Sequence, residues 1–140
     1  MVGILLITHN GLGDSLIDCV RHVLGVAPAH VRALSVLAKD DPVLKEQEAR
    51  ALIAQLDKGQ GVLLLSDVFG ATPCNIARRV CQPGRIEGVA GVNLPMLLRV
   101  ASYSNKSLDE LVHRALDGGR ECIVTIDSEG SDAATGCANH

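Results

Sequence analysis

The sequence predicts an α/β fold: a mostly parallel sheet with helices on both faces. Short apolar runs alternate along the chain with segments whose apolar residues recur at helical spacing. The runs at 2–7 and 62–65 are continuously apolar, which is typical of strands buried on both faces. With 140 residues and 47% apolar content, the chain suits one domain with one core. That core must be aliphatic, because the chain holds one Phe, one Tyr and no Trp.

The first predicted unit is a strand at 2–7, a turn that holds His9, and a helix that ends at Gly25. Gly is the usual residue just beyond a helix C-terminus, because it adopts a left-handed conformation readily. The helix is predicted from apolar residues three and four positions apart. They are Leu12, Leu16, Ile17, Val20, Val23 and Leu24.

The same order of elements then recurs without sequence repetition. A strand at 31–37 precedes a helix that Asp41 caps and that begins with Pro42. The strand at 62–65 precedes a third helix, for which Thr72 and Pro73 have the form of a cap and first residue. A weaker, glycine-containing strand at 86–92 leads to a helix from Met96 to about Tyr103.

The last part of the chain is predicted to add one helix and one strand. A capping box at 107–110 starts a helix that we expect to end at Gly118 and Gly119. Residues 122–126 are predicted as a fifth strand at the sheet edge, after strands in the order 2-1-3-4. The domain therefore spans 1–126, and the small, polar residues 127–140 are predicted as a disordered tail.

Composition excludes several classes of function. A net charge of −3 without a Lys/Arg cluster argues against nucleic-acid binding. The apolar run at 2–7 is too short for a signal peptide or a membrane span. The five cysteines are scattered without a C-x-x-C motif, so we expect free thiols in a reducing cytoplasm and neither a metal site nor a cofactor.

The candidate site lies where the strands end. Polar turns follow the first, third and fourth strands, and the carboxyl ends of parallel strands meet at one edge of a sheet. In the order 2-1-3-4 the first and third strands are neighbours, which brings His9 close to Asp67. A carboxylate that accepts a hydrogen bond from one ring N–H leaves the other ring nitrogen free as a nucleophile.

The same turns offer contacts for a phosphoryl group. Helix N-termini favour bound phosphate, and Gly11 and Gly70 allow its close approach. The hydroxyls of Thr8 and Thr72 are candidate donors to its oxygens. Asn10 and Ala71 complete these two turns. From the residues alone, the alternative stays open that His9 is an ordinary loop residue and Asp67 only a turn or cap residue.

Three segments resemble a known family. They are ITHNGLGDSL at 7–16, LSDVFGATPCN at 65–75 and GVNLPMLL at 91–98. Together they resemble the mannose-type IIA component of the bacterial phosphoenolpyruvate-dependent sugar phosphotransferase system, and the likeness covers about residues 1–126.

The resemblance implies a phosphohistidine carrier. In that family the first motif's His, here His9, accepts a phosphoryl group from the phosphocarrier HPr and passes it to a IIB component. The second motif's Asp, here Asp67, orients that His. Thr72 stands where a Ser usually contacts the phosphoryl group. The family forms homodimers whose last strand, here 122–126, can be exchanged.

The chain departs from the family pattern at two positions. The family has Gly directly after the His, where this chain has Asn10, and Ala71 replaces the second Gly of a Gly-Gly pair. Sugar-transporting members often carry a IIB domain after a flexible linker, whereas this sequence ends after a short tail. We therefore expect a free-standing IIA that feeds a separate IIB or acts through its phosphorylation state as a regulator.

Three alternatives predict different chemistry. A receiver domain phosphorylated on Asp67 predicts an acidic pair for Mg²⁺ after the first strand, where this chain has Thr8 and His9. The phosphotransfer subunit of dihydroxyacetone kinase shares the fold and the histidine but lacks the run found here at 69–73. A flavodoxin-like binding module would keep its function without His9.

Overall fold

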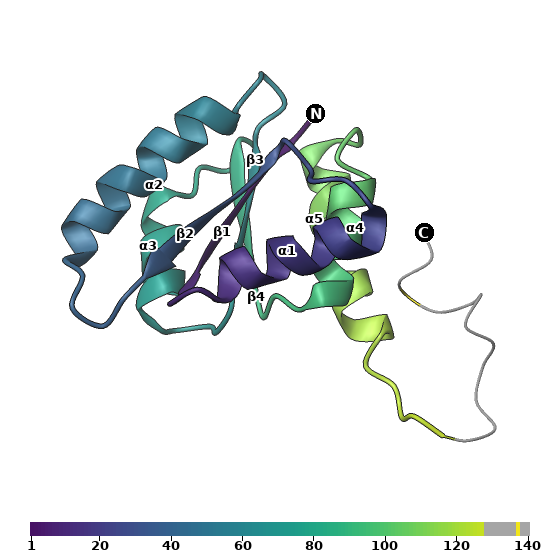
Figure 1. The fold of residues 1–140 in the computed structure, drawn as a ribbon. Coiled ribbons are helices and arrows are strands. Elements are labelled where there is room, and N and C mark those ends of the chain that lie inside the picture. Colours follow the sequence, from purple (N-terminus) through teal and green to yellow (C-terminus); the bar gives the residue numbers. More distant parts are fainter. Residues whose placement is uncertain (128–136, 138–140) are drawn as a thin grey trace.

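A computed structural model describes residues 1–127 and Cys137. Four parallel strands form one sheet in the order β2-β1-β3-β4, as predicted (Figure 1). Ile4 of β1 lies opposite Val31 of β2 and Leu63 of β3. The strands are β1 (Gly3–His9), β2 (Val31–Val36), β3 (Val62–Ser66) and β4 (Ile86–Ala90).

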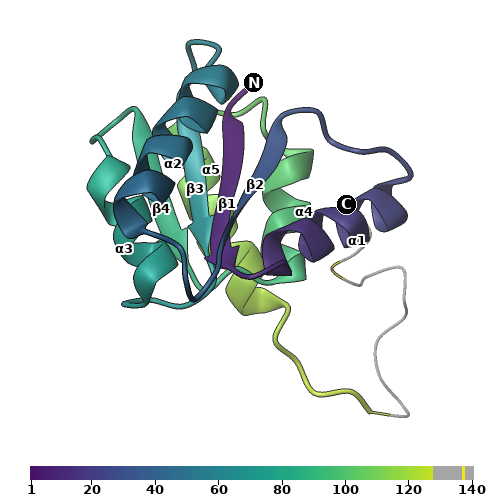
Figure 2. The ribbon, with the colours of Figure 1, turned by 60° about the vertical axis from the view of Figure 1, so that its left-hand side comes forward.

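Five helices cover the two faces of the sheet (Figures 1 and 2). On one face lie α1 (Leu12–Leu24), α4 (Leu94–Ser102) and α5 (Leu108–Glu121), and on the other lie α2 (Pro42–Leu56) and α3 (Thr72–Val80). The predicted helix–sheet–helix layering is therefore confirmed.

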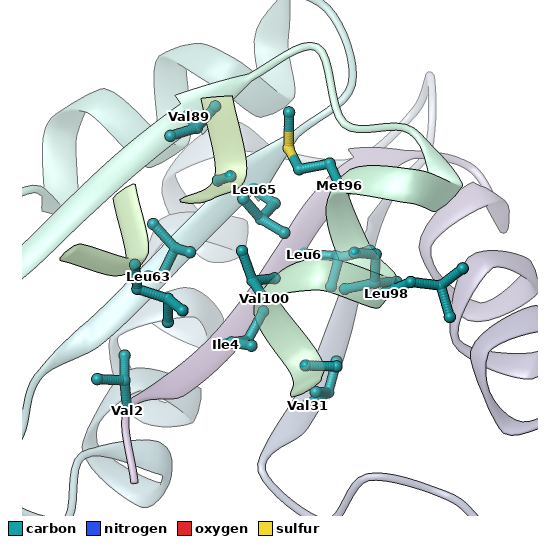
Figure 3. Packing of buried hydrophobic residues seen from close by; sticks show 14 of the residues in the cluster. Val2, Ile4, Leu6, Val31, Leu63, Leu65, Val89, Met96, Leu98 and Val100 are labelled. Atoms are coloured by element: carbon teal, nitrogen blue, oxygen red, sulfur yellow. The ribbon is translucent and has the colours of Figure 1, made fainter. Parts of the chain in front are cut away.

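Both faces of the central strands are buried, which explains their continuous apolar runs. Side chains alternate across a strand, so Ile4 and Leu6 of β1 pack toward α4 while Leu5 and Ile7 pack toward α2 and α3. Figure 3 shows the first cluster, where Leu6 and Leu65 meet Val100 of α4. No Phe, Tyr or Trp is among the buried core residues that the structure describes, so the core is aliphatic as predicted.

Predicted caps define three helix ends. The Asp41 side chain accepts a hydrogen bond from the Val43 amide at 2.9 Å, and Ser107 accepts one from Glu110 at 3.2 Å. Gly25 ends α1 in the left-handed region, with φ of 79°.

The sequence prediction is wrong about the end of α5. The helix continues through Gly118 and Gly119 to Glu121. Both glycines are buried, and a Cβ on Gly119 would lie 2.8 Å from Met96 Cε, while one on Gly118 would lie 3.0 Å from Arg99 Cβ. They serve the close approach of α4 and α5 rather than helix termination.

The predicted fifth strand at 122–126 is also absent. Residues 123–127 have no regular structure, and they run away from the sheet rather than along its edge (Figure 1). A strand requires a neighbouring strand as its hydrogen-bonding partner, and none of the four described strands pairs with 122–126. Most of the predicted tail, 128–136 and 138–140, lies outside the described residues.

The cysteine prediction needs one correction. Cys122 and Cys137 form a disulfide, with their Cα atoms 6.0 Å apart, whereas Cys19, Cys74 and Cys81 are free thiols. Because the two bonded cysteines are 15 positions apart and belong to no motif, their spacing gave no indication of the disulfide. Within 1–127, no helix has the length and apolarity to cross a membrane.

Candidate functional site

His9 and Asp67 meet at the carboxyl edge of the sheet. His9 is the last residue of β1, and Asp67 follows the last residue of the neighbouring strand β3. The ring atom His9 Nδ1 lies 2.8 Å from Asp67 Oδ2. The same oxygen accepts a hydrogen bond from the His9 backbone N–H at 3.0 Å. The strand order thus creates the contact predicted from it.

The pair is arranged asymmetrically with respect to solvent. The His9 side chain is 47% exposed, whereas that of Asp67 is only 8% exposed. Burial acts to raise the pKa of Asp67, but hydrogen bonds from the His9 backbone and ring outweigh it and hold that pKa below its usual value. An ionised Asp67 requires a proton on His9 Nδ1, and the unprotonated Nε2 is then the free nucleophile.

The second oxygen of Asp67 is also engaged. Asp67 Oδ1 accepts a hydrogen bond from the Val68 amide at 3.0 Å. Sequence reasoning missed this contact, since it depends on the conformation of the turn and not on the type of side chain. With both oxygens bonded, the carboxylate is fixed in its orientation toward the ring.

The turn after β1 has a left-handed residue. Asn10 has φ of 49°, and its backbone N–H donates a hydrogen bond to the Val36 carbonyl oxygen of β2 at 3.0 Å. Asn tolerates this region better than most residues other than Gly, which explains how Asn10 stands where Gly is usual. Gly11 then precedes α1 as its N-cap, without a side-chain capping bond.

Thr8 has a different place from the one predicted. Its side chain is fully buried, and its hydroxyl accepts a hydrogen bond from the Gly13 amide at 2.9 Å. A Cβ on Gly13 would lie 3.2 Å from that hydroxyl and 3.1 Å from Ala33 Cβ. Thr8 therefore holds the start of α1 against the sheet instead of facing the solvent side of His9.

The turn after β3 contains the other predicted phosphate contacts. Gly70 has φ of 89°, a conformation that favours glycine. Ala71 is extended and acts as the N-cap of α3, so Thr72 is already the first helical residue rather than the predicted cap. The Thr72 side chain is exposed, beside the N-terminus of α3.

Two further residues of this edge make contacts beyond those predicted. Phe69 is exposed in the turn, and the Arg78 guanidinium lies 5.5 Å from its ring centroid, so a cation from α3 comes to a turn that has none in its sequence. Asn93, in the turn after β4, accepts from the Met96 amide at 2.9 Å and donates to Gly119 O at 3.0 Å. It caps α4 and ties it to α5.

Comparison with known proteins decides the family. Residues 3–116 match a family model described as the fructose IIA component of the phosphotransferase system (EIIA-man). The chain belongs to this family. The mannose-type resemblance of its three motifs is therefore confirmed, and membership of this family supports a phosphocarrier role in the sugar phosphotransferase system.

Individual relatives agree with this assignment. The mannose-specific EIIAB component of Escherichia coli (strain K12) is 31% identical over 128 residues, covering 89% of this chain and 39% of the relative. The chain thus spans well under half the length of that protein. A mannose/sorbose-specific IIA subunit from Enterococcus faecalis shares the fold, with a TM-score of 0.82 at 23% identity over 94% of this chain and 98% of that one.

A third similar structure belongs to a protein associated with a different sugar. A IIA protein associated with the fucose utilization operon of Streptococcus pneumoniae has a TM-score of 0.70 at 26% identity. The alignment covers 84% of this chain and 93% of that one.

Proposed function

We propose that His9 carries the phosphoryl group, which it accepts from phospho-HPr and passes to a IIB component. The contact between His9 Nδ1 and the ionised Asp67 carries this proposal, because it leaves Nε2 as the nucleophile on an exposed ring. In the transfer, the P–N bond of the donor phosphohistidine breaks as a bond from phosphorus to Nε2 forms. The proton stays on Nδ1, and Asp67 stabilises the charge of the phosphorylated ring.

The neighbouring turns supply neutral contacts for the phosphoryl oxygens. The exposed Thr72 hydroxyl and the backbone amides of Thr72 and Leu12, which begin α3 and α1, are candidate donors, and a helix N-terminus favours negative charge. Gly70, Ala71, Asn10 and Gly11 shape the backbone of these turns.

Phosphorylation of Asp67 itself is disfavoured. Its side chain is nearly buried, and both oxygens accept hydrogen bonds, from His9 and Val68. A receiver domain needs this carboxylate exposed to its phosphoryl donor, together with acidic ligands for Mg²⁺. The part of the chain that the structure describes contains no cluster of three His, Cys, Asp or Glu side chains suited to a metal.

Transfer to His9 can be tested with purified components. We expect the chain to become labelled when incubated with labelled phosphoenolpyruvate, enzyme I and HPr, and His9→Ala to remain unlabelled. His22→Ala is the matched control, because His22 is exposed on α1 and makes no contact with Asp67. The label should survive alkali and be lost in acid.

Two results would contradict the proposal. Label that is lost in alkali indicates an acyl phosphate, as in a receiver domain, and equal labelling of His9→Ala moves the site elsewhere. Passage of the label to dihydroxyacetone kinase rather than to a IIB protein would support that alternative pathway.

We also propose that the protein forms a homodimer through 122–126. The side chains of Ile123, Val124 and Ile126 are at least 72% exposed in the single chain. The strand β4 is an edge of the sheet, and beyond Ile86, which forms a bridge with Gln82, none of the described strands pairs with its outer side. Pairing of 122–126 with β4 of a second copy would bury those side chains.

Light scattering measures this directly. We expect a mass about twice the 14.7 kDa of one chain, and a shift toward 14.7 kDa in Val124→Pro, since Pro blocks strand pairing. The control is Val26→Pro, in the exposed loop after α1. Val43→Pro would not serve, because Val43 lies within α2 and Pro would remove the backbone N–H that bonds to the Asp41 cap. A wild-type mass of one chain contradicts the dimer.

A further inference from the structure

A cavity lies at the opposite end of the sheet from His9, where the strands begin. Its volume is about 640 Å³, within the usual range for small-molecule sites. The loop after α1, the start of β2 and the C-terminal ends of α2 and α4 form its walls, and none of its lining residues belongs to the turns around His9. It is therefore separate from the proposed phosphoryl site.

The lining combines an apolar surface with positive charge. Apolar walls come from Leu24, Val26, Pro28, Leu56 and Ala101. The formally charged side chains of the lining are Arg32 and Lys58, and there is no Asp or Glu beside them. The cavity is thus complementary to a negatively charged molecule with an apolar part.

These two cations lack a protein counterion. Neither Arg32 nor Lys58 forms an ion pair within the described part of the chain, whereas the nearby Arg85 pairs with Asp57 at 2.8 Å. The Asp57 carboxylate also accepts hydrogen bonds from the Gly59 and Gly61 amides. The closest acidic residue in sequence to Lys58 is therefore already engaged.

His30 adds an unsatisfied polar atom to the same lining. Its Nε2 is buried and has no hydrogen-bond partner among the residues described. Burial, with a smaller contribution from the charged N-terminus, lowers the pKa of His30, while a hydrogen bond to the Ala101 backbone acts in the opposite direction. Buried polar atoms are normally paired, so the unpaired Nε2 marks the His30 side of this lining as incompletely satisfied.

We propose that this cavity binds a small organic anion, whose carboxylate or phosphate group lies between Arg32 and Lys58 and whose apolar body rests on Leu24 and Val26. The anion supplies a counterion to these two exposed cations. The apolar walls select molecules with a hydrocarbon portion over inorganic ions. The proposal does not depend on phosphoryl transfer at His9.

Titration by amide NMR tests this with four probes of matched size and different charge. Hexanoate and hexyl phosphate carry the two candidate anionic groups, while hexanol and hexylammonium carry the same chain without negative charge. We expect at least one anion to shift the amide signals of 24–32 and 55–58, with about tenfold higher affinity than hexanol. Comparison of the two anions then identifies the preferred group.

Variants test whether Arg32 and Lys58 contact the anion. Arg32→Gln and Lys58→Gln should each weaken binding of the anion by at least about threefold, and the double variant should reduce it to the level of hexanol. Lys39→Gln and Lys106→Gln are the controls, because both lie outside the cavity lining. Exposed Gln substitutions leave the core intact, which the unperturbed spectrum of each variant would verify.

Three outcomes would overturn the proposal. They are the absence of shifts from either anion up to about 10 mM, equal affinity for hexanol and the anions, and unchanged affinity in the double variant. Shifts confined to the amides around His9 and Thr72 would assign the binding to the phosphoryl site instead.

Discussion

Replacing Asp67 with Asn is expected to slow phosphoryl transfer to His9 by about 10²–10⁴-fold while the fold remains intact. Asp67 is ionised and lies 2.8 Å from the ring, so it both fixes the proton on Nδ1 and stabilises the positive ring that phosphorylation creates. Asn is nearly the same size but carries no charge. The effect should therefore fall on the rate of transfer.

The hydrogen bonds of Asp67 explain why Asn cannot substitute in either orientation. One oxygen accepts from the His9 backbone and ring, and the other accepts from the Val68 amide. An Asn side chain has only one oxygen, so its NH₂ group must face a donor on one side. With the NH₂ toward His9, the ring would be driven to the tautomer that has its proton on Nε2 and cannot attack.

The pH dependence of stability provides an independent readout. The pKa of Asp67 is below its unfolded value of 3.8, so the folded state binds this proton less tightly than the unfolded state. The stabilisation is therefore present above about pH 4 and is lost as the pH falls through the lowered pKa. Asp67→Asn removes this contribution, so the difference in unfolding free energy between the two proteins should shrink on acidification.

The control for Asp67 is Asp14→Asn. Asp14 is in the first turn of α1 and bonds to Ser35 at 3.5 Å rather than to His9. Initial rates of labelling from phospho-HPr, at matched protein concentration, compare the variants. If Asp67→Asn transfers within about threefold of wild type, Asp67 is not the group that orients the histidine.

The arrangement of strands could be predicted because it depends on features that the sequence displays. Continuously apolar strands such as 62–65 must be covered on both faces, and alternating helices supply the cover. Once β1 and β3 are neighbours, His9 at the end of β1 and Asp67 just after β3 must meet. Apolar patterning together with the expected strand order 2-1-3-4 therefore sufficed for the central contact of the site.

Features that depend on packing could not be predicted in this way. Gly118 and Gly119 are residues typical of a helix end, yet here they lie where α5 packs closely against Met96 and Arg99. Likewise, Thr8 is a residue type that often contacts phosphate, but here its hydroxyl accepts a hydrogen bond from the Gly13 amide at the start of α1. In both cases the same residue type serves two purposes, and only the neighbouring element distinguishes them.

Gly61→Ala is expected to be among the most destabilising single changes in the chain, and Gly59→Ala provides its control. Both glycines have left-handed backbones, with φ of 87° and 103°, so an alanine at either position costs about 1–2 kcal/mol of backbone strain. Both amides donate to Asp57 Oδ1, and alanine keeps those amides. The two substitutions therefore share every effect except the space around the new methyl group.

That space differs sharply between the two sites. A Cβ on Gly61 would lie 2.6 Å from the backbone oxygen of Arg85 and 3.0 Å from Leu108 Cδ2, whereas Gly59 has nothing within 4 Å. The Arg85 oxygen cannot move away freely, because it accepts the hydrogen bond from the Val62 amide at 3.0 Å, where β3 begins beside β4. Relief of the clash must therefore displace the start of β3.

Urea denaturation should show that the free energy of unfolding of Gly61→Ala is lower than that of Gly59→Ala by about 1–3 kcal/mol. Equal losses in the two variants would mean that the backbone conformation, and not the contact between this turn and Arg85, explains the glycine at 61. A larger loss at 61 would show that the turn after α2 sets the position of β3. Because Asp67 directly follows β3, that turn would then contribute to the geometry of the histidine site at the far end of the same strand.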